Sequence, residues 1–319
     1  MSASGPIAGS GAQPPRGVAG SRSSGSPLDP AVVARLAHLD IQARLVVEGF
    51  IAGMHRSPFH GFSVEFAEHR PYMPGDPLKN LDWKVLAKSD RYLIKQYTEE
   101  TNLRAHLLVD LSGSMGFMSK RASLSKLEYA RSLAAALAYL MIHQQDAVGT
   151  LLFADRPLRY VPPRSVRSHL DVVLKTLAEG EPAGRTKLGP ALHELAERIK
   201  RRGLVVLLSD LLDSPAEVLS GLQHFRHRNH EVIVFHILDP DEIDFPYTDA
   251  STFVDMESGA QLTTEPWEIA ARYRERLEAW RSRYSRACRE HLVDYVPLDT
   301  RTPFDRALLA YLEKRATLL

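Results

Sequence analysis

Four stretches of the chain are almost continuously apolar, and each ends in polar residues. They occupy residues 105–109, 147–154, 204–208 and 231–238. Runs of this length without polar alternation are typical of strands that are buried on both faces, as in a parallel sheet covered by helices. Further strands are predicted at 251–256 and 292–296, and the alternating residues 156–161 before Pro162-Pro163 predict an edge strand.

Helical periodicity fills the intervals between these runs. Apolar residues recur every three or four positions in the segments 126–145, 165–177, 187–202, 215–228, 267–289 and 303–314, and Ser125 is a candidate N-cap for the first of them. Strands that alternate with helices favour a doubly wound α/β fold, in which a mostly parallel sheet carries helices on both faces. We assign this domain to residues 100–319.

The part of the chain before residue 100 follows different patterns. Residues 1–27 are rich in Gly, Ser, Ala and Pro and predict a disordered tail. Residues 28–99 predict a small N-terminal subdomain with a helix at 30–54 and strands near 62–66 and 92–97. A turn is predicted at Pro74-Gly75-Asp76-Pro77, and Tyr72 and Trp83 are interpreted as core aromatic residues.

Composition narrows the functional classes. The 319 residues include 40 Lys plus Arg and 39 Asp plus Glu, a formal charge of +1, so no overall field attracts nucleic acid or an anionic membrane. No run approaches the ~18 consecutive apolar residues of a membrane helix. The single cysteine, Cys288, excludes an internal disulfide, and residues 1–27 lack the apolar core of a secretory signal. A cytoplasmic protein is predicted.

Oxygen-bearing side chains gather where two of the apolar runs end. Asp110 closes the first run and is followed by Ser112 and Ser114, while Asp210 follows the run at 204–208. Ligand sites of doubly wound sheets lie beyond the carboxyl ends of the strands, where strand order reverses. The two aspartates therefore face one crevice if their strands are neighbours there. Thr186, in the loop before the helix at 187–202, can lean over the same edge.

Two carboxylates and three hydroxyls are ligands that hard divalent cations prefer. We therefore predict a site for Mg²⁺, with Mn²⁺ or Ca²⁺ as alternatives. The pattern D-x-S-x-S is weak by itself, but its position at a strand end, with Thr186 and Asp210 on later elements, makes it more specific. Such a site leaves an open coordination position, which can accept a carboxylate from another molecule.

This constellation resembles the metal-ion-dependent adhesion site of von Willebrand factor type A domains. The matching residues are Asp110, Ser112 and Ser114 for the D-x-S-x-S element, Thr186 for the threonine loop and Asp210 for the second aspartate. The resemblance implies that the three hydroxyls bind the metal directly and that the aspartates do so directly or through water. It also implies that an Asp or Glu of a protein partner completes the shell.

A second resemblance covers roughly residues 45–240. The segments RPYMPGD and LDWK, upstream of DLSGSM, are similar to the family known as domain of unknown function 58. Members of that family are commonly found beside AAA-type ATPases of the MoxR group. The resemblance implies a non-enzymatic protein-binding module, namely an adaptor or chaperone-like partner of such an ATPase or of its client.

Two enzymatic alternatives use the same edge of the sheet. Ser112 or Ser114 is a candidate nucleophile of a hydrolase, but the elbow G-x-S-x-G is absent around both. Asp110 is a candidate for phosphoryl transfer, but the residue two positions later is a serine rather than an acid, and no P-loop opens a helix. Both alternatives predict turnover of an ester or phosphoester.

Two further polar clusters are interpreted as structural. Three histidines spaced by three residues favour the end of a helix over a metal site, because no cysteine or carboxylate is spaced to complete a zinc shell. These are His224, His227 and His230. An acidic run follows the carboxyl end of the strand at 231–238, where it can border the crevice, but we interpret it as a solvated loop outside the site. It comprises Asp239, Asp241, Glu242 and Asp244.

Overall fold

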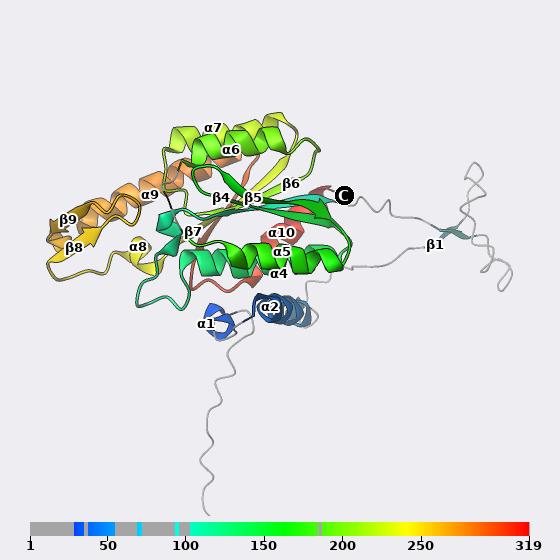
Figure 1. Cartoon of the computed structure of the whole chain (residues 1–319), viewed down its shortest axis with the longest axis horizontal. Coiled ribbons are helices and arrows are strands. Elements are labelled where there is room, and N and C mark those ends of the chain that lie inside the picture. Colours follow the sequence, from blue (N-terminus) through cyan, green and yellow to red (C-terminus); the bar gives the residue numbers. More distant parts are fainter. Residues whose placement is uncertain are drawn as a thin grey trace, which may run out of the picture.

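A six-stranded sheet lies at the centre of the protein (Figure 1). The computed structural model describes residues 29–34, 38–54, 69–71, 93–95, 103–182, 184 and 187–318. In spatial order the strands are β10 (Asp294–Asp299), β7 (Glu231–Leu238), β6 (Leu204–Ser209), β3 (Arg104–Asp110), β4 (Ala147–Phe153) and β5 (Pro157–Arg164). Neighbouring strands are parallel except β4 and β5, which form an antiparallel edge. The predicted mostly parallel sheet is confirmed.

Helices cover both faces of the sheet (Figure 1). One face carries α4 (Lys126–His143), α5 (Ser168–Glu179) and α10 (Asp305–Leu318), and the other carries α6 (Leu188–Arg198), α7 (Pro215–His227) and α9 (Pro266–Glu290). Side chains of β3 alternate between the two cores: Leu107 and Val109 join the first, and Leu108 joins the second. Burial on both faces explains why the strand sequences lack polar alternation, and it confirms the doubly wound fold class.

The order of the strands reverses at β3. From β3 the chain passes through α4 to β4 on one side, and it returns from β5 through α5 and α6 to β6 on the other side. β3 and β6 are direct neighbours, and Val109 lies opposite Leu208 in their register. The carboxyl ends of the two strands therefore meet at one edge of the sheet. The prediction that Asp110 and Asp210 face one crevice required their strands to be neighbours, and they are.

The N-terminal helical segment packs against this domain. The predicted helix at 30–54 is divided into α1 (Pro30–Val33) and α2 (Leu39–Met54), and α2 lies along α4 (Figure 1). Val46, Val47 and Phe50 are buried in the same core as α4. Ser132 of α4 also donates a hydrogen bond from its hydroxyl to Gln42 Oε1 of α2 (2.9 Å). The helix thus shares the core of the α/β domain, and a domain boundary near residue 100 stays a prediction.

A short antiparallel pair is the other described part of the segment 28–99. β1 (His69–Pro71) pairs with β2 (Leu93–Lys95), which falls within the strand predicted at 92–97. The predicted strand at 62–66, the turn at Pro74-Gly75-Asp76-Pro77, Tyr72 and Trp83 lie outside the described residues, as does the predicted tail at 1–27.

Three small elements extend beyond the carboxyl ends of the strands. The 3₁₀ helix η2 (Gly113–Gly116) follows β3, and the short helix α8 (Pro240–Asp244) follows β7. β8 (Ser251–Val254) and β9 (Gln261–Thr264) form a hairpin that lies with α8 at one end of the molecule (Figure 1). Cys288 of α9 is a buried free thiol. In the described part of the chain, no helix combines the length and apolar character that a membrane crossing requires.

Candidate functional site

Asp110 ends β3 with a completely buried carboxylate. Its Oδ1 accepts a hydrogen bond from the backbone N–H of Ser112 (2.8 Å), and its Oδ2 accepts one from the hydroxyl of Ser209 (2.6 Å). Burial, and then the charge of Asp210, raise the pKa of Asp110 to about 7. Among the described residues no cationic side chain forms an ion pair with this carboxylate. A cation placed beside Asp110 would therefore be strongly favoured.

Ser112 and Ser114 follow Asp110 in the turn that leads into η2. Their hydroxyl oxygens lie 3.2 Å apart. Two adjacent ligands of an octahedral Mg²⁺ ion, each about 2.1 Å from the metal, are about 3.0 Å apart. Ser112 is buried and Ser114 is half-buried, so the turn opens toward solvent at Ser114. The two hydroxyls thus have the spacing of neighbouring ligands on one accessible cation.

Gly113 brings this turn close to two other loops. Its N–H donates a hydrogen bond to the carbonyl of Gly184 (3.3 Å). A Cβ at position 113 would lie 3.1 Å from the carbonyl oxygen of Met256 and 3.3 Å from that of Gly184, so a side chain would require these carbonyls to shift by a few tenths of an ångström. Thr186 lies outside the described residues. Its role as a ligand stays a prediction.

Asp210 has a cationic partner that the sequence pattern did not reveal. The ammonium nitrogen of Lys126, which is completely buried, lies 2.8 Å from Asp210 Oδ2 and 2.6 Å from Glu242 Oε1. Burial opposes the charge on the lysine, but the two carboxylates outweigh it, so the pKa of Lys126 is raised and the side chain is charged. The carbonyl of Asp210 accepts a hydrogen bond from His236 Nε2 (2.9 Å), which fixes its backbone. Asp210 therefore has a counter-ion within the protein, which it shares with Glu242.

Lys126 owes its position to the first turn of α4. Ser125 caps this helix as predicted: its hydroxyl accepts the N–H of Glu128 (3.2 Å), and Glu128 Oε2 accepts the N–H of Ser125 (2.8 Å). A cationic side chain at the start of a helix is disfavoured by the helix dipole. The two carboxylates that the lysine reaches compensate for this unfavourable position.

The acidic run after β7 belongs to this edge of the sheet, so its interpretation as a solvated loop is wrong. Asp239 is completely buried and caps α8, accepting N–H groups from Asp241 (2.8 Å) and Ser119 (2.9 Å). Glu242 Oε2 accepts the N–H of Asp239 (2.8 Å), while its other oxygen binds Lys126. The spacing of Asp239 and Glu242 is that of a capping box, a signal that the sequence did contain.

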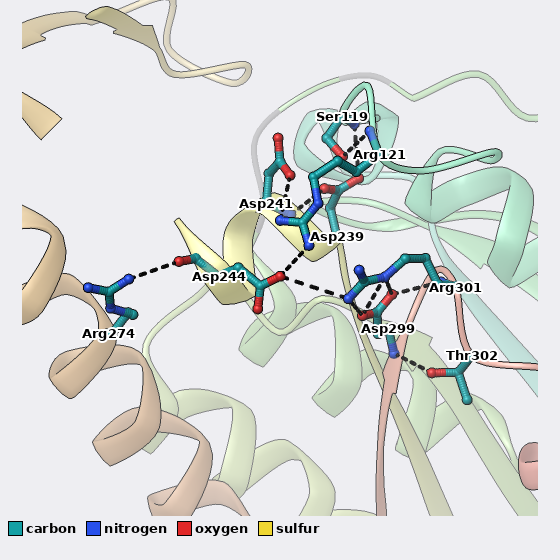
Figure 2. A network of polar contacts seen from close by, with 9 residues as sticks. All are labelled: Ser119, Arg121, Asp239, Asp241, Asp244, Arg274, Asp299, Arg301 and Thr302. Carbon is teal, nitrogen blue, oxygen red and sulfur yellow. Dashed lines mark hydrogen bonds and ion pairs between the residues drawn. The ribbon is translucent and has the colours of Figure 1, made fainter. Parts of the chain in front are cut away.

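Arginines hold α8 from its outer side (Figure 2). Arg121 pairs with Asp241 (3.3 Å) and with Asp244. Arg301 pairs with Asp299, and its guanidinium also lies 3.9 Å from the Asp244 carboxylate. α8 is therefore fixed by a buried lysine on one side and by partly exposed arginines on the other.

Only some of the predicted oxygen ligands are arranged to bind a hard cation. Ser112, Ser114 and Asp110 stand together, whereas one oxygen of Asp210 is engaged by Lys126. Within the described ranges, no group of three or more His, Cys, Asp or Glu side chains is arranged to hold a metal ion. A cation at this edge would therefore depend on the seryl hydroxyls. Lys126, Ser209 and Glu242 are the contributors that pattern reasoning missed.

The three histidines near the end of α7 do not converge on one point. His224 Nδ1 lies 3.0 Å from His193 Nδ1, and His224 Nε2 lies 2.9 Å from Glu197 Oε1. His230 is buried and donates from Nε2 to the carbonyl of Ile199 (3.1 Å). Their interpretation as structural side chains agrees with these contacts.

Comparison with known proteins gives a family match and several similar folds. Residues 68–291 match the family described as Protein of unknown function DUF58. The uncharacterized proteins Rv1480 of Mycobacterium tuberculosis and Mb1516 of Mycobacterium bovis are each 30% identical over 271 residues, which cover 83% of this chain and 80% of theirs. BatB from Bacteroides thetaiotaomicron is 16% identical, covering 67% of this chain and 99% of its own, with a TM-score of 0.47. The SpRpn10 von Willebrand factor type A domain is 10% identical, covering 65% and 93%, with a TM-score of 0.39.

Proposed function

The chain belongs to the family described as Protein of unknown function DUF58, and from this premise we propose that it is a non-enzymatic module that binds protein partners through a divalent cation. The proposed cation is Mg²⁺, with Mn²⁺ or Ca²⁺ as alternatives. Ser112, Ser114 and Thr186 would bind it through their hydroxyls, and Asp110 and Asp210 directly or through water. An Asp or Glu of the partner would take the open position.

One observation carries the proposal: a buried carboxylate that has no cationic partner among the described residues stands beside a pair of hydroxyls with the spacing of neighbouring ligands. Asp110 is stabilised by hydrogen bonds from Ser112 and Ser209, while burial and Asp210 raise its pKa. A buried charge without a counter-charge is costly. A bound cation would remove that cost, and the hydroxyls of Ser112 and Ser114 would help to hold it.

The ion pair of Asp210 with Lys126 supports the choice of a carboxylate as the partner's ligand. Because Lys126 already pairs with Asp210, a cation beside Asp110 would meet one carboxylate that lacks a cationic partner among the described residues, together with neutral hydroxyls. Such a cation keeps much of its positive charge and attracts an anionic ligand. Mg²⁺ also retains several waters, which a partner's carboxylate can replace.

The contacts do not favour the enzymatic alternatives. In the described structure, neither Ser112 nor Ser114 shares a hydrogen bond with a histidine that would act as its general base. Both oxygens of Asp110 accept hydrogen bonds, which lowers their nucleophilicity toward phosphorus.

We propose a MoxR-type AAA ATPase, or its client, as the protein partner. This choice follows from what the resemblance of RPYMPGD and LDWK to the DUF58 family implies, because its members are commonly found beside such ATPases. The geometry adds only the requirement that the partner present an accessible Asp or Glu at the Ser114 side of the turn.

Metal binding and partner binding are tested with the same variants. Binding of Mn²⁺, followed by electron paramagnetic resonance, should weaken at least tenfold in Ser112→Ala/Ser114→Ala. Ser282→Ala is the matched control, since Ser282 lies on α9 and contacts Glu278. In a pull-down with a purified MoxR-type ATPase, the wild type should retain the ATPase in Mg²⁺ and release it in chelator. The proposal would be overturned if the double variant bound Mn²⁺ as tightly as the wild type does. It would also be overturned if the wild type retained the ATPase equally well in chelator and in Mg²⁺.

A further inference from the structure

A cavity of about 390 Å³ lies directly beside the candidate cation site. It is bounded by the turn at Ser114, by α8, by the β8–β9 hairpin and by the first turns of α9, the group of elements at one end of the molecule in Figure 1. Ser114 lines this cavity and is also a proposed ligand of the cation. A molecule bound at the cation would therefore lie directly next to the cavity and could extend into it.

The cavity wall is aromatic and preformed. Phe245 stands at its centre, with ring centroids 4.4 Å from Tyr273, 5.3 Å from Tyr247 and 5.6 Å from Phe253. Tyr273 donates its hydroxyl hydrogen to the carbonyl of Glu242 (2.7 Å), which ties α9 to α8. Phe245 adopts a left-handed backbone with φ of 47°, a costly conformation for a bulky residue. Packing of its ring holds it there, so the wall needs little reorganisation to receive a ligand.

Exposed apolar side chains form the rim of the cavity. Leu212 is 44% exposed, Met256 is 51% exposed and Val254 is 55% exposed. They come from the loop after β6 and from the hairpin, which are far apart in the sequence but border one cavity. Contiguous exposed apolar groups with polar surroundings are typical of binding surfaces.

The charges of the cavity favour an apolar occupant over a cationic one. Asp241 is paired with Arg121, and Glu242 is paired with Lys126. Asp255 accepts the backbone N–H groups of Glu257 (2.8 Å) and Ser258 (3.2 Å) in its own turn. The carboxylates that border the cavity thus have partners, while the aromatic faces and the rim offer apolar contacts. The volume lies near the lower end of the range for ligand pockets, roughly 300–1,000 Å³.

We propose that this cavity binds a large apolar side chain, Leu, Met or Phe, of the same partner segment that supplies the docking carboxylate. The inference rests on the proposed function, because the carboxylate on the cation brings the segment to Ser114. It specifies the partner further: a peptide segment in which an Asp or Glu is followed within about three residues by a bulky apolar residue. The cation would bind the carboxylate of the partner segment, and the cavity would select the apolar side chain beside it.

Peptide binding to the full chain tests this specificity. The probes are fluorescein-labelled, acetylated hexapeptides of Gly and Ser with one Glu, followed one, two or three positions later by Phe, Leu, Lys or Ser. With Mg²⁺ present, the best Phe or Leu peptide should bind at least tenfold more tightly than its Ser counterpart. Val254→Ser/Met256→Ser should reduce that ratio below about twofold, without changing Mn²⁺ affinity. Val172→Ser, at an exposed position of α5, is the control for substitution of a surface valine.

The outcomes separate this inference from the proposed function. Mg²⁺-dependent binding with equal affinity for Phe and Ser peptides would overturn the cavity inference alone, and so would a preference for Lys. If Mg²⁺ has no effect on any peptide, the proposed function fails, and the cavity is then judged by the NMR signal of the ¹³C-labelled Met256 methyl group. A shift of that signal with the Phe peptide but not the Ser peptide supports an apolar binding site. Absence of such a shift overturns it.

Discussion

Asp110 is the last residue of β3 and Asp210 is the first residue after the neighbouring strand β6, yet their surroundings differ. Both carboxylates are completely buried. Asp110 receives hydrogen bonds from Ser112 and Ser209, whereas Asp210 forms a 2.8 Å ion pair with Lys126. The same sequence signal, an acid that follows an apolar strand, thus leads to one carboxylate with an internal counter-ion and to another that has none among the described residues.

This difference separates structural charge from charge available for a ligand. A buried ion pair contributes little net stability when compared with apolar packing, but removal of one partner leaves a costly unpaired charge. Asp210, Lys126 and Glu242 therefore hold the first turn of α4 and α8 in place. Asp110 has no cationic partner in the described part of the chain, and the proposed external cation would bind beside it.

The largest effect is expected from Lys126→Met. Methionine fills a similar volume but leaves Asp210 and Glu242 without their shared cation, so the free energy of unfolding should fall by about 3–5 kcal/mol. Urea unfolding monitored by circular dichroism measures this loss. Lys175→Met, at an exposed position of α5, is the matched control and should change stability by no more than about 0.5 kcal/mol. Equal losses in the two variants would mean that Lys126 is not the counter-ion of this edge.

A smaller effect, of opposite direction at the two sites, is expected when each aspartate is replaced by asparagine. Asp210→Asn weakens the contact with Lys126 and should cost about 2–3 kcal/mol. Asp110→Asn removes a buried charge that has no cationic partner among the described residues, so in chelator at pH 8 stability should stay unchanged or rise. Thermal unfolding of both variants in one buffer measures the contrast. A similar loss at both positions would abolish the distinction between the two carboxylates.

The contrast between Asp110 and Asp210 also shows how much of the site can be predicted from the sequence. Apolar runs that end in Asp110 and before Asp210 predict a parallel sheet with both acids at one edge, because burial on both faces dictates the strand pattern. Lys126 could not be found in this way. It is separated from Asp210 by 84 positions, and its burial follows from how the start of α4 packs over the strand ends. Glu242 was within reach through the capping-box spacing with Asp239, which predicts a short helix instead of a loop.

The response to metal sharpens the same comparison. Mg²⁺ at a hundredfold excess over its dissociation constant should stabilise the chelator-treated wild type by about 2.7 kcal/mol, if it binds the folded state alone. Asp110→Asn and Ser112→Ala/Ser114→Ala should lose this stabilisation, because they remove the proposed ligands. Asp210→Asn should keep most of it, because Lys126 already engages one oxygen of that side chain. Differential scanning calorimetry with and without Mg²⁺ measures the increments. A larger loss in Asp210→Asn than in Asp110→Asn would reverse the proposed roles.

The smallest effect is expected from Arg121→Met, which tests whether burial decides the importance of a cation at this edge. Arg121 contacts two carboxylates of α8, Asp241 and Asp244 (Figure 2). Lys126 likewise contacts two carboxylates, Asp210 and Glu242. The side chain of Arg121 is 38% exposed and that of Asp244 is 42% exposed, while Asp241 is buried, so water screens these ion pairs far more than those of the completely buried Lys126. Tm should therefore change by no more than about 2 °C. A loss as large as that of Lys126→Met would show that the outer contacts of α8, and not the buried lysine, hold this edge together.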